Sequence, residues 1–288
     1  MKYILIFLLT INLYSFDAFV SPSELKSSFE DKNLVIIDVE SKDLYLKNHI
    51  SGAIHADISD FINISNKKML MSSSADIQSQ LKKLGINSDS NVVIYSHNTN
   101  SGVLNSSYLA LVLISNGFSN VSILDGGLLA WIFEFPILSS VRETIKVTEG
   151  NFTVSNKVDI MVDLNYIKES KKIILDSRST QHYYGIKKSK NIKQLGHIPF
   201  SKSSYYKDKF LADGTIRNTK DLKKIFIDGY ELDVDNEVII YGDNLLMASM
   251  NWYILYHMMG FKNTKIYEAS LVEWGNKKEL PMTRFKWE

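Results

Sequence analysis

VIIYGDNLLMASMNW, residues 238–252, joins a four-residue apolar run to a short polar loop and the start of a helical pattern. A short apolar run bounded by polar residues and followed by helical spacing is typical of a buried strand that leads into a helix. The same order occurs earlier in the chain, where VVIYSHNTNSG spans residues 92–102 and is also followed by a helical pattern. The sequence therefore contains the strand–loop–helix unit of an α/β sheet twice.

Further elements flank both copies in the same order. The first copy is accompanied by apolar runs at residues 34–37, 121–124 and 128–131, and the second by runs at 173–175, 264–267 and 271–274. Alternation of short apolar runs with helical patterns predicts parallel sheets covered by helices. The spacing between equivalent residues drifts, which indicates two domains with different loops and not a short-period solenoid.

The ordered set of segments resembles the rhodanese family, specifically its two-domain thiosulfate and 3-mercaptopyruvate sulfurtransferases. The resemblance implies an α/β fold of two tandem rhodanese-like domains, each a five-stranded parallel sheet flanked by helices. The segments that carry it are VIIDVESKDLYLKNHISGAIH (35–55), VVIYSHNTNSG (92–102), NGFSNVSILDGGLLAW (116–131), IILDSRSTQHYYG (173–185), LGHIPFS (195–201), VIIYGDNLLMASMNW (238–252) and MGFKNTKIYEASLVEWG (259–275).

The length of 288 residues fits two domains preceded by a signal peptide. Lys2 precedes an apolar run from Ile4 to Leu13, too short to span a bilayer of about 30 Å and suited to a cleaved signal. We expect cleavage after Ser15, or otherwise after Ala18, and hence a periplasmic or secreted protein without a transmembrane span. The alternative is an uncleaved amphipathic start or a buried first strand. The expected division is 1–15 signal, 16–138 N-terminal domain, 139–157 linker and 158–288 C-terminal domain.

The chain contains no cysteine. This excludes disulfides, thiolate metal sites and every form of cysteine catalysis. In active members of the family, the loop after the central strand begins with a cysteine that carries sulfur as a persulfide. The resemblance places Gly242 at that position in the C-terminal domain and Ser96 in the N-terminal domain. Neither residue can form a persulfide, so we expect an inactive sulfurtransferase.

The rest of the C-terminal loop also departs from the family pattern. The resemblance places basic, anion-holding residues of active members at Asn244 and at His182, where a neutral amide and a mostly neutral imidazole weaken anion binding. We expect the large side chains at 245–247 to fill or cover the anion cradle. The degenerate loop comprises Asp243, Asn244, Leu245, Leu246, Met247 and Ala248.

Several reactive residue types have simpler interpretations. We expect His49 and His197 to bind backbone carbonyls, with no zinc site, and Ser96 with His97 not to form a catalytic pair. Three further expectations concern structural residues. Asp38 and Asp176 would cap or tie loops, Arg178 would form an ion pair or cross the domain interface, and the aromatic residues Trp131, Trp252, Trp274 and Tyr183 would lie in the core. The basic stretch of Lys187, Lys188, Lys190 and Lys193 is expected to be solvated, with a partner surface as the alternative.

The chain has 33 basic and 32 acidic residues and a formal net charge of +1, so its overall charge does not attract it to nucleic acid. We expect no cofactor and no nucleic acid partner. The leading hypothesis is a non-catalytic module that binds a protein partner or a small anionic or sulfur ligand. The alternative is sulfurtransfer that is retained through the thiol of a partner, or a hydrolase built on Ser96.

Overall fold

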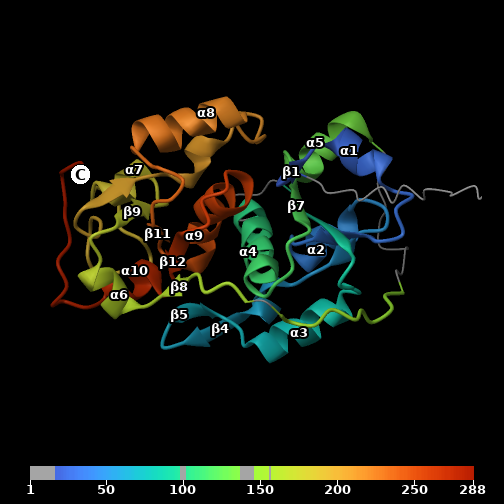
Figure 1. The fold of residues 1–288 in the computed structure, drawn as a ribbon, viewed down its shortest axis with the longest axis horizontal. Helices are drawn as coiled ribbons and strands as arrows, with labels where there is room; N and C mark the ends of the chain where they lie inside the picture. The colour runs from blue at the N-terminus through green and yellow to red at the C-terminus, as the bar shows by residue number, and fades with distance from the viewer. Residues whose placement is uncertain (1–16, 98–101, 137–145, 156) are drawn as a thin grey trace, which may run out of the picture.

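The computed structural model describes residues 17–97, 102–136, 146–155 and 157–288. It contains two five-stranded sheets, one in each half of the chain, with every strand pairing parallel to its neighbour (Figure 1). The predicted fold class is therefore confirmed. The expected signal peptide lies outside the described residues, apart from the alternative end at Ala18, and the expected linker lies partly outside them. Its described part runs along the N-terminal domain, where Phe152 is buried against Phe118.

The N-terminal sheet has the strand order β1-β7-β6-β2-β3. Its strands are β1 (Phe19–Val20), β2 (Leu34–Asp38), β3 (Ile54–His55), β6 (Asn91–Tyr95) and β7 (Val121–Leu124). The helices of this domain are α1 (Pro22–Ser27), α2 (Lys42–Lys47), the 3-10 helix η1 (Ile58–Phe61), α3 (Ser74–Lys83), α4 (Gly102–Ser115) and α5 (Gly127–Glu134). Strands β6 and β7 are buried along their whole length, as their continuous apolar runs predict.

The C-terminal sheet has the strand order β10-β9-β11-β12-β8. Its strands are β8 (Met161–Val162), β9 (Ile173–Asp176), β10 (Ser201–Ser203), β11 (Val238–Tyr241) and β12 (Thr264–Tyr267). The helices are α6 (Leu164–Glu169), α7 (Thr180–Tyr183), the 3-10 helix η2 (Tyr206–Lys209), α8 (Thr219–Lys223), the π-helix η3 (Lys224–Gly229), α9 (Leu245–Trp252), the π-helix η4 (Tyr253–Met258) and α10 (Ser270–Trp274).

A hairpin of β4 (Ile62–Ser65) and β5 (Lys68–Met71) extends from the N-terminal domain to the C-terminal domain. Both residues of its two-residue turn have positive φ, 49° at Asn66 and 66° at Lys67, as a type I′ turn requires. The backbone N–H of Met71 donates to the Glu268 carboxylate at 2.9 Å. The hairpin therefore places part of the first domain beside the loops of the second.

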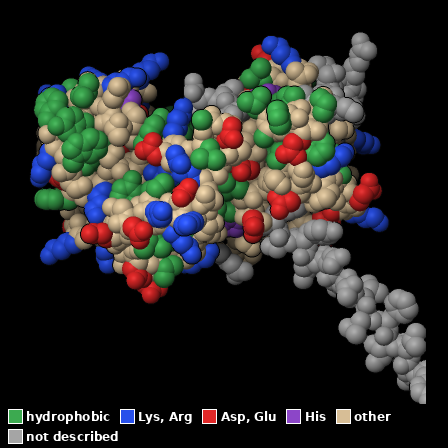
Figure 2. All heavy atoms as spheres, turned by 90° about the horizontal axis from the view of Figure 1, so that it is seen from above, with side chains coloured by type: hydrophobic (Ala, Val, Ile, Leu, Met, Phe, Trp, Pro, Cys, Tyr) green, Lys and Arg blue, Asp and Glu red, His purple; other side chains and the backbone are tan. Residues whose placement is uncertain are grey.

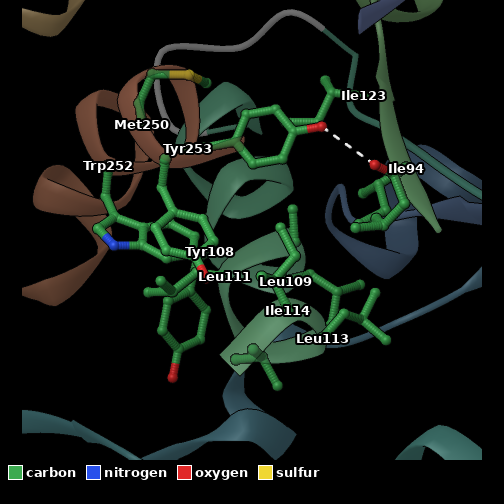
Figure 3. Packing of buried hydrophobic residues seen from close by; sticks show 14 of the residues in the cluster. Ile94, Tyr108, Leu109, Leu111, Leu113, Ile114, Ile123, Met250, Trp252 and Tyr253 are labelled. Carbon is green, nitrogen blue, oxygen red and sulfur yellow. Dashed lines mark hydrogen bonds between the residues drawn. The ribbon is translucent and has the colours of Figure 1, made fainter. Parts of the chain in front are cut away.

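The two domains share a core between α4 and α9, which lie side by side at the centre of the molecule (Figure 1). The hydroxyls of Ser107 and Ser249 are 2.7 Å apart across this interface. Tyr108, Trp252 and Tyr253 are fully buried in the same cluster (Figure 3). The helices that follow Ser96 and Gly242 are thus packed against each other.

A further interdomain contact is made by Asp125, which follows the last residue of β7. Its carboxylate accepts the backbone N–H of Ile216, from the C-terminal domain, at 2.7 Å. Burial raises the pKa of Asp125 to about 6, although hydrogen bonds from the backbone of Ile216 and Gly126 oppose the shift. The folded protein therefore favours the protonated carboxyl more than the unfolded chain does.

This shift predicts how stability changes with pH. Asp125 contributes most to the free energy of unfolding below pH 4. This contribution is lost as the pH rises through about 6, because the pKa of Asp125 is higher in the folded protein than in the unfolded chain. Relative to Asp125→Asn, the wild type should lose about 1–2 kcal/mol of unfolding free energy between about pH 4 and about pH 7. Urea denaturation at both pH values measures this difference. The exposed Asp89→Asn variant is the control, and parallel pH profiles of the wild type and Asp125→Asn would contradict the prediction.

Candidate functional site

The loop after β11 lies at the carboxyl edge of the C-terminal sheet, where ligands of open α/β sheets bind. Several of its amides are already used within the protein. The Gly242 N–H donates to Ser270 Oγ at 3.3 Å, and the Met247 N–H donates to Asn244 Oδ1 at 3.2 Å, which caps α9. The Ala248 N–H donates to the Asn244 carbonyl at 3.4 Å. These three amides are therefore not free to hold an anion.

Met247 occupies the space beside Gly242. The backbone of Gly242 is not in the left-handed region, so it could accept another residue. A Cβ at this position, however, would lie 2.7 Å from Met247 Cβ and 3.1 Å from Met247 Cγ, closer than ordinary van der Waals contact. Leu245 and Leu246 point instead to the interdomain core, Leu245 being fully buried. Among Leu245, Leu246 and Met247, it is therefore Met247 that occupies the space into which a side chain at position 242 would extend.

The positive charge of Arg178, beside the loop residue Asp243, is balanced by carboxylates. Arg178 is buried and binds both oxygens of Asp176, with Nε–Oδ1 at 3.0 Å and Nη2–Oδ2 at 2.7 Å. Its Nη2 also donates to the Gly196 carbonyl at 2.6 Å. The loop carboxylate of Asp243 lies 3.7 Å from Nη1 and accepts the Ser189 hydroxyl at 2.6 Å. The carboxylates of Asp176 and Asp243 thus both lie beside the Arg178 guanidinium, and their negative charges oppose the binding of an anion to this guanidinium.

His182 adds no positive charge to this group. Its Nδ1 lies 2.7 Å from the Ser179 hydroxyl, and the residue is half-buried. Burial lowers the pKa of His182, and the neighbouring Arg178 and Lys187 lower it further while Asp243 opposes them. The imidazole is therefore mainly neutral at pH 7.

A cleft of about 310 Å³ opens over the degenerate loop. Asp243, Asn244 and Val272 lie on one side, and the hairpin residues Ile64, Lys67 and Met69 lie on the other. Ser189, Lys190, Asn191 and Ile192 complete the lining. The volume is at the lower end for small-molecule sites, and the two lysines give the mouth a positive charge. Sequence reasoning missed the hairpin side because those residues come from the other domain.

Ser96, at the start of the equivalent loop of the N-terminal domain, lines a small cavity between the two domains. Ser96, Gly126 and Gly127 line a cavity of about 20 Å³ with Phe210 and Gly214 of the C-terminal domain. Such a space holds about one water molecule. This cavity, as the described residues form it, is too small for a substrate.

The His97 ring is engaged by a carboxylate that the sequence did not identify. Its Nε2 lies 2.8 Å from Asp38 Oδ2, and its backbone N–H donates to Glu40 Oε2 at 3.3 Å. Between the described residues Ser96 and His97, no hydrogen bond joins the hydroxyl to the ring. The arrangement has a base and an orienting carboxylate but lacks the bond that would activate a serine nucleophile.

The family follows from comparison with known proteins. A model of the rhodanese-like domain matches residues 21–134 and again residues 163–277. The chain belongs to the rhodanese family. The sulfur carrier protein TtuD of Thermus thermophilus is 24% identical to it over 292 residues, covering 93% of this chain and 97% of TtuD. A thiosulfate sulfurtransferase of Corynebacterium glutamicum is 26% identical over 277 residues, covering 91% of this chain and 89% of the enzyme.

Solved structures show the same fold. The crystal structure of YnjE superposes with a TM-score of 0.80 at 20% identity, over 95% of this chain and 70% of YnjE. The wild-type structure of EanB gives a TM-score of 0.80 at 20% identity, over 94% and 70% of the two chains. This chain thus keeps the tandem-domain scaffold of its family.

The remaining polar candidates make structural contacts. His49 Nδ1 and His197 Nδ1 each lie 2.8 Å from a backbone carbonyl, as expected. Asp38 also accepts the Glu40 N–H, and the predicted ion pair of Arg178 is the one with Asp176. Trp131, Trp252, Trp274 and Tyr183 are buried, and the four lysines of 187–193 are exposed. Among the described residues, no cluster of three acidic, histidine or cysteine side chains could hold a metal ion.

Proposed function

We propose that this rhodanese-family protein is a non-catalytic binding module of the cell envelope. The observation that carries the proposal is the contact of Met247 with the space beside Gly242, the residue that the family resemblance assigns to the sulfur-carrying position. Sulfurtransfer needs a thiolate that forms a bond to the sulfane sulfur as the donor leaves, and the chain has no cysteine. The family resemblance to sulfurtransferases then concerns the scaffold and not the chemistry.

The proposed ligand site is the cleft over the C-terminal loop. The one carboxylate among the described residues that line the cleft, Asp243, is already paired with Arg178 and Ser189. Lys67 and Lys190 therefore favour a small anionic or sulfur-containing group on the hairpin side of the cleft, where Ile64 and Met69 provide apolar contact. The second-domain loop is the better candidate because the cavity that the described residues form beside Ser96 holds only about one water molecule.

Export is the second part of the proposal, supported by Lys2 and the apolar run from Ile4 to Leu13. In the described ranges, no helix is long and apolar enough to cross a bilayer. N-terminal sequencing of the protein recovered from the envelope fraction tests this, with a start at Phe16 or Phe19 expected. Recovery with Met1 intact would contradict it.

The absence of sulfurtransferase activity can be tested with thiosulfate as the sulfur donor and cyanide as the acceptor. The wild type is expected to form thiocyanate no faster than the uncatalysed reaction. Gly242→Cys alone is expected to remain inactive, because its Cβ would meet Met247. The double variant Gly242→Cys/Met247→Gly removes that contact, and mass spectrometry shows whether its thiol acquires one sulfur atom.

Two outcomes of this assay are decisive. Thiocyanate formation by the wild type, with or without an added small thiol, would overturn the non-catalytic assignment. A gain of sulfur by the double variant but not by Gly242→Cys would support the view that Met247 closes the site. Calorimetric titration with thiosulfate tests the cleft, and Lys67→Glu/Lys190→Glu should weaken any binding, with the exposed Lys42→Glu/Lys47→Glu pair as control.

A further inference from the structure

The C-terminal tail forms an ordered edge at the end of the C-terminal domain that faces away from the N-terminal domain (Figure 1). The Phe285 N–H donates to the Tyr184 carbonyl at 3.0 Å. The Trp287 ring stacks on Tyr183 and Tyr184, with centroid distances of 5.3 Å to each. The tail is therefore fixed on the domain by both backbone and ring contacts.

Large apolar side chains gather on this edge and remain exposed. Their exposed fractions are 81% for Phe200, 67% for Ile186, 58% for Phe285 and 57% for Trp287. Figure 2 shows hydrophobic side chains massed at this end of the molecule, with Lys and Arg around them. The segments are contiguous, because the Phe200 N–H donates to the Glu288 carboxylate and Arg284 Nη2 donates to the Gly185 carbonyl. We call the exposed residues Phe200, Ile186, Phe285 and Trp287 together the aromatic edge.

The backbone holds two of these aromatic residues in an unfavourable conformation. Phe200 has φ of 65° and Phe285 has φ of 57°, both in the left-handed region that bulky residues avoid. Neither ring is buried, so core packing does not compensate for the conformation. Strained backbone conformations cluster at functional sites, and this clustering makes the surface around Phe200 and Phe285 a candidate for binding.

Basic side chains surround the aromatic edge. Lys168, Lys171 and Lys172 line a hollow of about 450 Å³ together with Phe200 and the edge of Trp274. Arg284 and Lys286 lie in the tail itself, and Lys187 and Lys188 follow Ile186 directly. Acidic residues of the same segments are Glu169 on α6, Glu279 just before the lining residue Pro281, and Glu288, which is paired with Lys286 at 3.1 Å. The edge therefore carries a local positive charge although the whole chain is close to neutral.

We infer that the aromatic edge and its lysines bind the surface of an anionic phospholipid bilayer. Exposed Phe and Trp side chains enter the boundary between headgroups and acyl chains, where an apolar ring is favourable. The surrounding Lys and Arg meet the lipid phosphates, each contributing about 1 kcal/mol near an anionic surface. A second copy of the chain fits less well, because a two-fold contact would bring these like charges together.

Trp287 provides a direct readout of this contact. Trp131, Trp252 and Trp274 are buried, so Trp287 is the exposed one of the four tryptophans in the chain. Addition of vesicles of phosphatidylcholine mixed with phosphatidylglycerol should move its emission to shorter wavelength. Vesicles of phosphatidylcholine alone should move it less, and salt should weaken the effect. Trp287→Phe should remove the emission change.

Co-sedimentation with the same vesicles tests the residues. Phe200→Ser and the triple variant Lys168→Glu/Lys171→Glu/Lys172→Glu should each weaken binding, the triple variant by at least about tenfold. The matched controls are Phe133→Ser, an aromatic that is 91% exposed on the N-terminal domain, and Lys42→Glu/Lys47→Glu/Lys83→Glu. The apolar run Ile4–Leu13 is the same in every variant, so differences between variants report on the edge.

Three results would overturn the inference. One is an unchanged Trp287 emission with anionic vesicles. Another is equal sedimentation of Phe200→Ser and Phe133→Ser. The third is a dimer in analytical ultracentrifugation that Phe200→Ser abolishes, without lipid binding by the wild type, because this would assign the edge to self-association.

Discussion

Arg178→Met is expected to destabilise the protein by about 3–5 kcal/mol at neutral pH. The substitution leaves Asp176 fully buried with a charge that no cation balances. The Tyr241 hydroxyl, at 2.7 Å, and the backbone N–H of residue 178 would still donate to the carboxylate, but neither carries a charge. The Gly196 carbonyl would also lose its guanidinium donor. Urea denaturation followed by circular dichroism measures the loss.

The double variant Asp176→Asn/Arg178→Met separates the charge from the packing. It removes both ions, so it should be more stable than Arg178→Met alone despite carrying one more substitution. The exposed Arg284→Met variant is the control and should change the unfolding free energy by less than about 0.5 kcal/mol. A cost for Arg178→Met near that of Arg284→Met would show that Asp176 does not depend on its ion pair.

The central strands could be predicted from sequence because burial on both faces requires continuous apolar runs. The prediction for β11 agrees with its observed bounds, and that for β9 differs by the closing Asp176. The edge strands β1 and β8 are two residues long, too short for any periodicity to indicate them. The helical pattern that begins in the 238–252 segment leaves α-helical geometry after Trp252 and continues as a π-helix over Tyr253–Met258.

The hairpin was missed for a related reason. Its turn, Asn66-Lys67, lacks the glycine that marks most two-residue hairpin loops, so the pattern around it gave no clear signal. Without the hairpin, the sequence could not indicate that Lys67 and Met69 of the first domain line the cleft of the second. The cleft is a property of domain packing.

For the candidate sites as well, some residues could be predicted from the sequence while their contacts could not. The order of motifs predicts that Gly242 stands at the cysteine position, whereas the contact of that position with Met247 depends on the geometry of the helix start. Asp38 and His97 are 59 residues apart, yet Asp38 pairs in register with Tyr95 at the end of the neighbouring strand. A carboxylate that ends one parallel strand and a histidine just after the next give a usable signal, because such strand ends meet at one edge.

Trp252→Ala is expected to cost about 3–5 kcal/mol, through lost burial and the cavity left in the shared core. The indole is fully buried, stacks on Tyr256 at 4.5 Å and donates from Nε1 to the Thr264 carbonyl at 3.0 Å. Trp252→Phe keeps an apolar ring and should cost less. Trp287→Ala removes the same side chain from an exposed position and should cost less than about 1 kcal/mol. Because α4 and α9 share one core, urea denaturation followed by circular dichroism should show the whole transition moving in Trp252→Ala. A shift confined to part of a biphasic transition would instead mean that the two domains unfold independently.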